Sequence, residues 1–269
     1  MRLQEEYDRL LSLIAARQHV AVAFSGGVDS SLLCRAARDA LGDASLAITV
    51  AGPMMPSTDI VSAKQIAVLT GIRHLVIEDK GVDESVAANP ANRCYHCKRI
   101  EFARIVALAR EHGAQTVLDG SNRDDESDYR PGMQALAELG IVSPFRAVGM
   151  GKAEIRELAR ELGLPTWNKP AAACLGSRIA YGERITLKKL RAVDRAEQIL
   201  REHGFMQCRV RHHGDIARIE VAPDERRGFF DTPRLDTLSQ QIKALGFKYV
   251  CLELEGYRMG SLNAVLRRS

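Results

Sequence analysis

The chain has 269 residues, of which 46% are apolar and 27% charged, and this length is enough for one large domain or two modest ones. The formal net charge of +4 is small for the size, so it permits an anionic substrate but does not by itself indicate a nucleic-acid-binding protein. No apolar run approaches the length of a membrane span, and we expect a cytoplasmic protein with no membrane partner.

The first part of the chain is expected to alternate between helix and strand. Residues 1–17 carry leucines at helical spacing among acidic side chains, which predicts an amphipathic helix and is unlike a signal peptide. Short apolar runs and helical stripes then alternate, so we expect a parallel sheet covered by helices on both faces. The expected strands are 19–24, 44–50, 73–78 and 116–119, and the expected helices are 30–41, 58–70, 100–112 and 151–162.

The pattern changes after about residue 181, where alternating strands and a tight polar turn predict a hairpin between two helices. The fold class is therefore predicted as α/β, with a first domain over residues 1–180 and a small α+β domain over 181–269. The expected elements of the second domain are a helix at 186–203, strands at 207–212 and 216–221, a helix at 233–245 and a strand at 249–254.

The stretch SGGVDSS, residues 25–31, lies between the first expected strand and its helix. A glycine-rich turn at this place aims backbone N–H groups at an anion, and the helix dipole adds to the attraction. Gly26 and Gly27 permit close backbone approach, and hydroxyl donors can be added by Ser25, Ser30 and Ser31. The loop has neither the lysine of GxxxxGK[ST] nor the GxGxxG pattern, and a plain turn capping an ordinary helix is the alternative.

The string SGGVDS resembles the pyrophosphate loop of the N-type ATP pyrophosphatases, the PP-loop superfamily. The resemblance implies that ATP is cleaved between its α and β phosphates, that the substrate is adenylated, and that the loop holds the departing pyrophosphate. It also implies that Asp29 helps to hold Mg²⁺, a hard cation that commonly bridges phosphates and carboxylates. The first domain is then a PP-loop ATP pyrophosphatase domain.

Polar residues at the ends of later elements support this site. Ligands on a parallel sheet bind at the carboxyl ends of the strands, and the fourth expected strand is followed by Ser121, Asn122, Asp124 and Asp125. These side chains could hold ribose, adenine or metal, or they form a solvated acidic loop. Lys152, at the start of a helix, could reach the phosphates, or it is a lone exposed lysine.

Six cysteines in a chain without a secretion signal suggest reduced thiols used for chemistry or metal binding. Cys94 and Cys97 form a CxxC pair, and Cys174 lies far away in the sequence. A CxxC alone suits a redox pair, half a zinc site or part of a cluster site. Three thiolates with one vacant corner suit a [4Fe–4S] cluster with an open iron, or a zinc with an open position. The other cysteines are expected to be buried small hydrophobic side chains, namely Cys34, Cys208 and Cys251.

Over nearly its whole length, the chain resembles the LarE family of ATP-dependent sulfur transferases. The shared blocks are SGGVDSS, CYHCK, KPAAACLGSR, YGERIT, RVRHHGDIARIEV and, near the end, LEGYR with Gly260 and Ser261. The resemblance implies adenylation of a carboxylate on pyridinium-3,5-dicarboxylate mononucleotide, followed by displacement of AMP by sulfur to give a thiocarboxylate for the nickel-pincer cofactor. AMP makes the carboxylate oxygen a leaving group, so the task of the enzyme is positioning and charge neutralisation.

The same resemblance implies roles for residues of the second half. The residue matching Cys174 carries the sulfur chemistry, and Arg209 and Arg211 match positions that hold the substrate phosphate, which two guanidinium groups on one strand face would suit. A solvated strand face is the alternative for both arginines. Glu197 and Glu220 match acidic positions associated with metal, although surface carboxylates are common on helices and strands. The domain 181–269 is accordingly expected to bind substrate phosphate and to take part in a homo-oligomer.

Members of the family differ in the source of sulfur. One form sacrifices its own cysteine and leaves dehydroalanine, and another holds a [4Fe–4S] cluster on three cysteines. Because Cys94 and Cys97 accompany Cys174, we predict the cluster form, supplied by sulfide or another sulfur donor. The rival interpretations are a sacrificial Cys174, a tRNA thiolation enzyme, an amide ligase similar to NAD synthetase, and a nucleotide sensor. A small mononucleotide is preferred to nucleic acid as the partner, because no RNA-binding motif is recognised.

Overall fold

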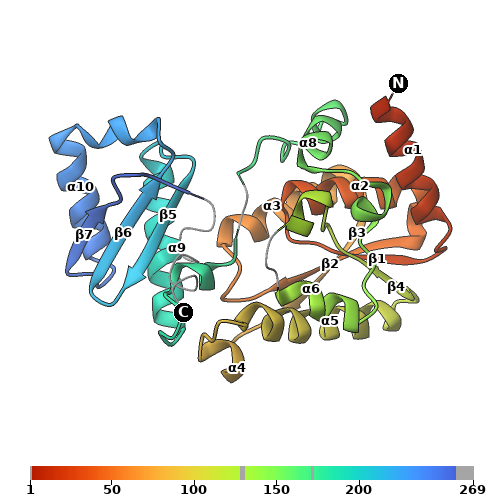
Figure 1. Ribbon diagram of the computed structural model, residues 1–269, viewed down its shortest axis with the longest axis horizontal. Helices are drawn as coiled ribbons and strands as arrows, with labels where there is room; N and C mark the ends of the chain where they lie inside the picture. The colour runs from red at the N-terminus through yellow and green to blue at the C-terminus, as the bar shows by residue number, and fades with distance from the viewer. Residues whose placement is uncertain (1, 128–130, 171–172, 259–269) are drawn as a thin grey trace. The chain divides into compact units, whose positions relative to one another are not determined.

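The computed structural model describes residues 2–127, 131–170 and 173–258, and it divides into two compact units (Figure 1). The first unit consists of Met1–Lys80 with Asn92–Ala172, and the second of Gly81–Ala91 with Ala173–Ser269. Sequence reasoning placed the boundary after residue 180 and left 81–91 in the first domain. These residues belong to the second unit because the Asn89 side-chain amide donates to the carbonyl oxygens of Ala180, at 2.7 Å, and Glu183, at 3.0 Å.

The first unit is built around a four-stranded sheet in the order β3-β2-β1-β4, in which all the strand pairs are parallel. Its strands are β1 (Val20–Ala23), β2 (Ser45–Ala51), β3 (Arg73–Glu78) and β4 (Thr116–Leu118). Its helices are α1 (Arg2–Ala15), α2 (Val28–Leu41), α3 (Ser57–Thr70), α5 (Arg93–Glu111), α6 (Pro131–Glu138), α7 (Pro144–Val148) and α8 (Lys152–Glu161).

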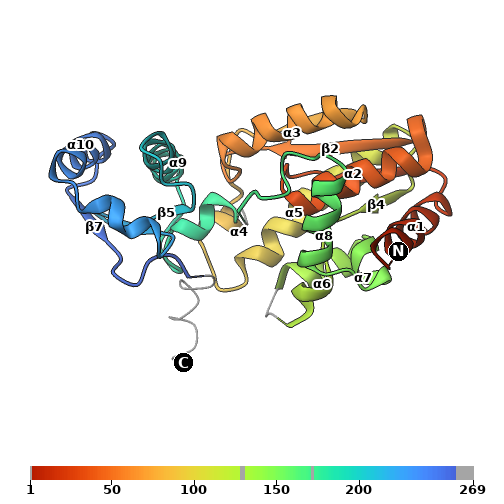
Figure 2. The same ribbon diagram turned by 90° about the horizontal axis from the view of Figure 1, so that it is seen from above.

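Helices cover both faces of this sheet, as the alternating pattern predicts. One buried cluster joins the sheet to α1, α2, α3 and α8, and a second joins the opposite face to α5 and α6. Figures 1 and 2 show the two layers, with α2 and α3 on one side of the strands and α5 and α6 on the other. The central strand β1 reads VAVA without polar alternation because both of its faces are covered. The predicted α/β class is confirmed.

The second unit holds a three-stranded mixed sheet in the order β5-β6-β7. β5 and β6 form the predicted antiparallel hairpin, and β7 lies parallel to β6 after the crossover through α10. Figure 2 shows α9 and α10 side by side on this sheet. The elements are α4 (Glu84–Ala87), a 3₁₀ turn η3 (Leu175–Arg178), α9 (Leu187–Glu202), β5 (Cys208–His213), β6 (Ile216–Val221), a 3₁₀ turn η4 (Glu225–Phe229), α10 (Thr232–Lys243) and β7 (Tyr249–Leu252).

Besides the domain boundary, two further expectations are not met. α5 begins at Arg93 rather than at residue 100, because its first turns carry polar residues and show no apolar stripe that periodicity could detect. Cys251 is exposed, not buried as predicted, because it lies on β7 at the edge of the small sheet. Among the described residues, no helix combines the length and apolar character needed to cross a bilayer. Gly260 and Ser261, quoted above for the family resemblance, lie outside the described residues.

Candidate functional site

The loop of residues 25–31, called the PP-loop below, connects β1 to α2 at the carboxyl edge of the first sheet. Gly26 has a φ of +72°, and a Cβ at this position would lie 2.6 Å from the carbonyl oxygen of Asp59, so only glycine fits. The Ser30 hydroxyl lies 3.1 Å from the Ser25 hydroxyl, accepts from the Ser25 backbone N–H at 3.3 Å, and donates to the Gly27 carbonyl at 3.3 Å. The loop is therefore folded by its own serine and is not a simple helix cap.

Ser31 takes a different position from the other loop serines. Its side chain is fully buried, and its hydroxyl has no hydrogen-bond partner among the described residues. The Ser31 backbone N–H donates to the Gly27 carbonyl at 2.9 Å, which starts the hydrogen-bonding pattern of α2. The predicted role of its hydroxyl as a phosphate donor stays a prediction.

Asp29 lies where three elements of the first unit meet. Lys152, the first residue of α8, donates from Nζ to both carboxylate oxygens of Asp29 at 2.6 and 2.5 Å. Asn122, from the loop after β4, donates from Nδ2 to Asp29 Oδ1 at 3.2 Å. Gly120 makes this approach possible, because a Cβ there would lie 3.1 Å from the Asp29 Cβ. Three residues that the sequence singled out separately are thus brought together.

The loop after β4 is tightly structured. The Asp119 carboxylate accepts hydrogen bonds from the Ser121 backbone and hydroxyl and, at 2.5 Å, from the Ser143 hydroxyl. Asp124 accepts from the Lys152 backbone N–H at 2.7 Å, and Asp125 accepts from the Asn122 backbone N–H at 2.9 Å. Asp125 therefore shapes the loop that presents Asn122, and Asp124 joins this loop to the start of α8 at Lys152, so a merely solvated acidic loop does not describe them.

Lys169 is a site residue that sequence reasoning missed. Its Nζ donates to the carbonyl of Gly26 in the PP-loop at 2.8 Å and forms an ion pair with Asp59 Oδ1 at 2.8 Å. Asp59 belongs to α3 and is only 6% exposed. Lys169 was quoted above only as the first letter of a family block, and no local signal marks it, because Asp59 and Gly26 are distant in the sequence.

None of the six cysteines forms a disulfide. Cys94 and Cys97 lie one turn apart near the start of α5 in the first unit, and both are partly exposed. Cys174 belongs to the second unit and is also partly exposed. Within the described residues, no group of three or more metal-ligating side chains is assembled. Cys34 and Cys208 are buried as expected, and burial raises the pKa of the Cys208 thiol to about 12.

Cys174 lies beside a buried arginine. The carbonyl of Cys174 accepts from the Ser177 hydroxyl at 2.8 Å and from Arg178 Nη1 at 3.1 Å. Arg178 is 1% exposed and pairs through Nε and Nη2 with both carboxylate oxygens of Glu197, at 2.8 and 3.0 Å. Burial alone would lower the pKa of Arg178, but the Glu197 carboxylate and, to a smaller degree, Cys174 raise it. A permanent cation is therefore fixed next to this cysteine.

The arginine pair of β5 is buried, which excludes the solvated strand face. Arg209 and Arg211 are each 5% exposed. Arg211 pairs with both oxygens of Glu220, at 3.0 and 2.7 Å, whereas the Arg209 guanidinium lies 5.2 Å from the centre of the Tyr257 ring. Burial first and the Arg178 charge second lower the pKa of Arg209. Glu197 and Glu220 are fully buried partners of arginines, so they are not surface carboxylates.

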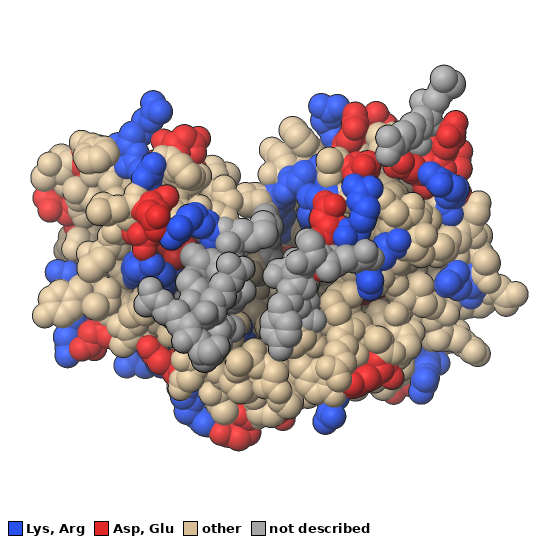
Figure 3. Space-filling view, in the orientation of Figure 1, with Lys and Arg blue, Asp and Glu red and all other residues tan. Residues whose placement is uncertain are grey.

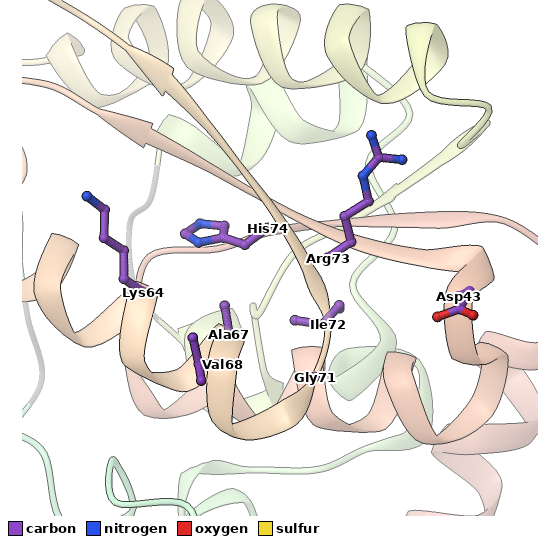
Figure 4. A pocket seen from close by; sticks show the side chains of 8 residues that line it. All are labelled: Asp43, Lys64, Ala67, Val68, Gly71, Ile72, Arg73 and His74. Atoms are coloured by element: carbon purple, nitrogen blue, oxygen red, sulfur yellow. The ribbon is translucent and has the colours of Figure 1, made fainter.

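A surface hollow of about 490 Å³ lies elsewhere on the first unit (Figure 4). Its lining includes Asp43, which precedes β2, and Gly71, which precedes β3, so it lies at the amino ends of the strands. The PP-loop follows the carboxyl end of β1, and none of the predicted site residues lines the hollow. Because the hollow contains none of these residues, the candidate site is defined by the contacts among its side chains and not by this hollow.

On the face drawn in Figure 3, basic and acidic side chains are interspersed.

Comparison with known proteins gives relatives over almost the whole chain, although no family model matches it. An uncharacterized protein of Synechocystis is 41% identical over 267 residues, which is 99% of this chain and 100% of that protein. The pyridinium-3,5-bisthiocarboxylic acid mononucleotide synthase of Lactiplantibacillus plantarum is 37% identical over 262 residues, 97% of this chain and 94% of that enzyme. The tRNA-specific 2-thiouridylase MnmA of Azorhizobium caulinodans is 31% identical over 193 residues, 58% of this chain and 50% of that enzyme.

Proposed function

The chain belongs to the LarE family of pyridinium-3,5-bisthiocarboxylic acid mononucleotide synthases, and on that premise we propose that it is an ATP-dependent sulfurtransferase. The proposed substrate is pyridinium-3,5-dicarboxylate mononucleotide. The observation that carries the proposal is the junction of Asp29, Asn122 and Lys152 beside the PP-loop, at the carboxyl edge of a parallel sheet. Ligands of such sheets bind at this edge.

In the proposed first step, a carboxylate oxygen of the substrate attacks the α-phosphorus of ATP. The bond from that phosphorus to the bridging oxygen breaks, and pyrophosphate leaves with the electron pair. The backbone N–H groups of the PP-loop and the amino end of α2 would hold the departing anion. The ammonium of Lys152 binds Asp29 of the PP-loop, which supports a role for this lysine in neutralising the charge that develops on the phosphates.

Mg²⁺ is implied by the PP-loop superfamily, and the residues present fit it. The Asp29 side chain is 24% exposed, lies at the start of α2, and binds the ammonium of Lys152. A carboxylate that already binds a cation offers the hard oxygen ligands and negative charge that suit Mg²⁺, with phosphate oxygens and water as its other ligands. We propose that Asp29 holds the ion when ATP is bound, and that the ion neutralises phosphate charge there.

In the second step, a sulfur nucleophile attacks the carbonyl carbon of the acyl adenylate, and AMP leaves to give the thiocarboxylate. We assign the sulfur chemistry to Cys174, which the fixed cation of Arg178 accompanies. The substrate phosphate is assigned to Arg209 and Arg211, whose buried guanidinium groups lie on one face of β5, with that of Arg211 held in place by Glu220. On this proposal the second unit binds the substrate phosphate and contributes to a homo-oligomer.

We further propose the [4Fe–4S] form, with Cys94, Cys97 and Cys174 as ligands. The two thiols of the CxxC lie one turn apart on α5, both are partly exposed, and neither is in a disulfide, as a shared ligand pair requires. The group would supply an open iron able to carry an added sulfide. A sacrificial Cys174, converted to dehydroalanine, is the alternative, and it has no use for the CxxC.

The test of this proposal starts with anaerobically purified protein. Iron and acid-labile sulfide are expected in the wild-type protein and should be lost in Cys94→Ala, while Cys251→Ala, which alters an exposed thiol, retains both. Incubation with ATP and the substrate should release AMP and pyrophosphate and give the thiocarboxylate, detected by mass spectrometry. Iron-free protein that converts Cys174 to dehydroalanine in a single turnover would replace the cluster form with the sacrificial form.

The remaining rivals are separated by two further measurements. An amide ligase would retain turnover in Cys174→Ala, because ammonia and not sulfur would be its nucleophile. The similarity to MnmA is the reason to test a tRNA thiolation enzyme as a rival. Such an enzyme would bind tRNA with an affinity that falls steeply as the salt concentration rises. We expect no tRNA binding at physiological salt, measured by gel shift.

A further inference from the structure

The carbonyl group of Gly26 receives two side-chain donors. Lys169 Nζ donates to it at 2.8 Å, and the Ser62 hydroxyl, on α3, donates at 3.2 Å. A peptide unit is planar and trans, so its C=O and the following N–H point to opposite sides. Holding the Gly26 carbonyl toward Lys169 and Ser62 therefore sends the Gly27 N–H to the other side. In the described part of the chain, no acceptor is recorded for that N–H.

The ammonium group that holds this carbonyl is itself held. Asp59 Oδ1 lies 2.8 Å from Lys169 Nζ, and the Asp59 side chain is 9% exposed. A carboxylate buried to this extent is strongly biased toward an ion-pair partner, because an unpaired buried charge is costly. The backbone carbonyl of Asp59 also lies directly under Gly26, 2.6 Å from where a Cβ would be. Asp59 thus fixes both the loop and the lysine that orients it.

The backbone that carries Lys169 is fixed as well. Arg156, on α8, donates from Nη1 to the Trp167 carbonyl at 2.6 Å and from Nη2 to the Lys169 carbonyl at 2.8 Å. α8 begins with Lys152, whose ammonium binds Asp29 at the other end of the PP-loop. The contacts therefore close a ring from the PP-loop through α8 to the segment of Lys169 and back to the PP-loop.

We propose that Lys169, held by Asp59, is a positioning residue of the pyrophosphate site. It fixes the peptide between Gly26 and Gly27 so that the loop N–H groups point to the anion before any ligand arrives. The inference rests on the proposed function in one respect, namely that the PP-loop binds pyrophosphate. It assigns no contact between Lys169 and the ligand, because the ammonium is already committed to Asp59 and the Gly26 carbonyl.

The experiment compares two ligands on the full-length protein by isothermal titration calorimetry: magnesium pyrophosphate, which needs the PP-loop donors, and AMP, which lacks the departing group. In Lys169→Met, the affinity for pyrophosphate is expected to fall about tenfold or more, as for a lost charge-assisted hydrogen bond, and the affinity for AMP to change less than about twofold. Lys169→Arg retains a cationic donor and should regain part of the pyrophosphate affinity.

Lys64→Met is the matched control, because Lys64 is an exposed lysine of α3 on the lining of the remote hollow. It should leave both affinities unchanged. The proposal is overturned if Lys169→Met binds pyrophosphate as the wild-type protein does, or loses both ligands equally, as a general loss of structure would cause. Both binding measurements are made without the sulfur-accepting substrate. A wild-type protein that transfers no sulfur would therefore overturn the proposed function, and the comparison of the two affinities would still stand.

Discussion

Individual cysteines in this chain have very different surroundings, although no disulfide joins any of them. Cys34 and Cys208 are fully buried, and burial raises the pKa of both thiols. Cys251 is exposed on β7, and Cys94 and Cys97 are partly exposed on α5. Because the thiolate is the reactive form, reactivity follows exposure and pKa together.

This leads to a prediction for alkylation of metal-free protein with iodoacetamide at mildly alkaline pH. In the folded protein, Cys251 should be alkylated at least about 100 times faster than Cys34 or Cys208. The raised pKa of the two buried thiols lowers their thiolate fraction, and burial keeps the reagent away, so they should react only after unfolding. Peptide mass spectrometry over time checks it, with urea-unfolded protein as the reference. Equal rates for Cys208 and Cys251 in the folded protein would contradict it.

At the scale of single elements, α9 carries a buried carboxylate, that of Glu197, which is paired with arginines. The Glu197 carboxylate is fully buried and accepts hydrogen bonds from Arg178 Nε at 2.8 Å, Arg201 Nη2 at 3.1 Å and the Val210 backbone N–H at 3.1 Å. Burial raises the pKa of Glu197, but the arginines and hydrogen bonds outweigh it and lower the pKa below its ordinary value. A carboxylate with these contacts joins α9 to η3 and β5.

Glu197→Gln is therefore expected to lower the free energy of unfolding at neutral pH by about 3 kcal/mol, because the buried charge of Arg178 loses its partner. A lowered folded-state pKa gives stability that is present above the unfolded pKa and is lost as pH falls through the folded pKa. The gap between wild type and Glu197→Gln should then narrow below about pH 4.

Urea unfolding across this pH range measures both effects. Glu202→Gln, on the same helix, removes one partner of a surface ion pair with Arg195 and should change stability little at any pH. A gap between wild type and Glu197→Gln that does not depend on pH would contradict the ion-pair explanation, and the loss would then belong to packing.

At the scale of the whole molecule, the second unit is discontinuous in sequence. Residues 81–91, which include α4, reach it from within the first half of the chain, whereas its sheet, α9 and α10 come from residues after 173. Through its side-chain amide and its carbonyl, Asn89 forms hydrogen bonds with the backbone of Ile179, Ala180, Gly182 and Glu183. The Ile185 backbone N–H donates to the carbonyl of Ala87 at 2.8 Å.

A fragment of residues 173–269 should consequently be less stable than the same fragment joined through a flexible linker to residues 81–91. We expect the joined form to gain about 2 kcal/mol or more in urea unfolding, since several buried hydrogen bonds are restored at about 1 kcal/mol each. The Asn89→Ala form of the joined fragment is the control and should lose most of the gain. Equal unfolding midpoints for all three fragments would contradict the assignment.

Sequence periodicity predicted the alternating elements of the first unit and the helix, hairpin and strand order of the second. β3 was predicted with the bounds that the structure has, and α3 ends before Gly71 in the left-handed conformation expected of a terminating glycine. The PP-loop was recognised because its glycines, serines and Asp29 are adjacent in the chain. These features depend on residues that are close in sequence, where side-chain spacing directly reflects backbone geometry.

Only the tertiary structure decided which distant residues meet. It brought Lys152 and Asn122 to Asp29, placed Lys169 on the Gly26 carbonyl, and buried Glu197 and Glu220 against arginines. It also moved residues 81–91 into the second unit. The reason is that a salt bridge or a buried hydrogen bond needs two partners, and a lysine or glutamate alone in the sequence looks the same whether it is solvated or paired.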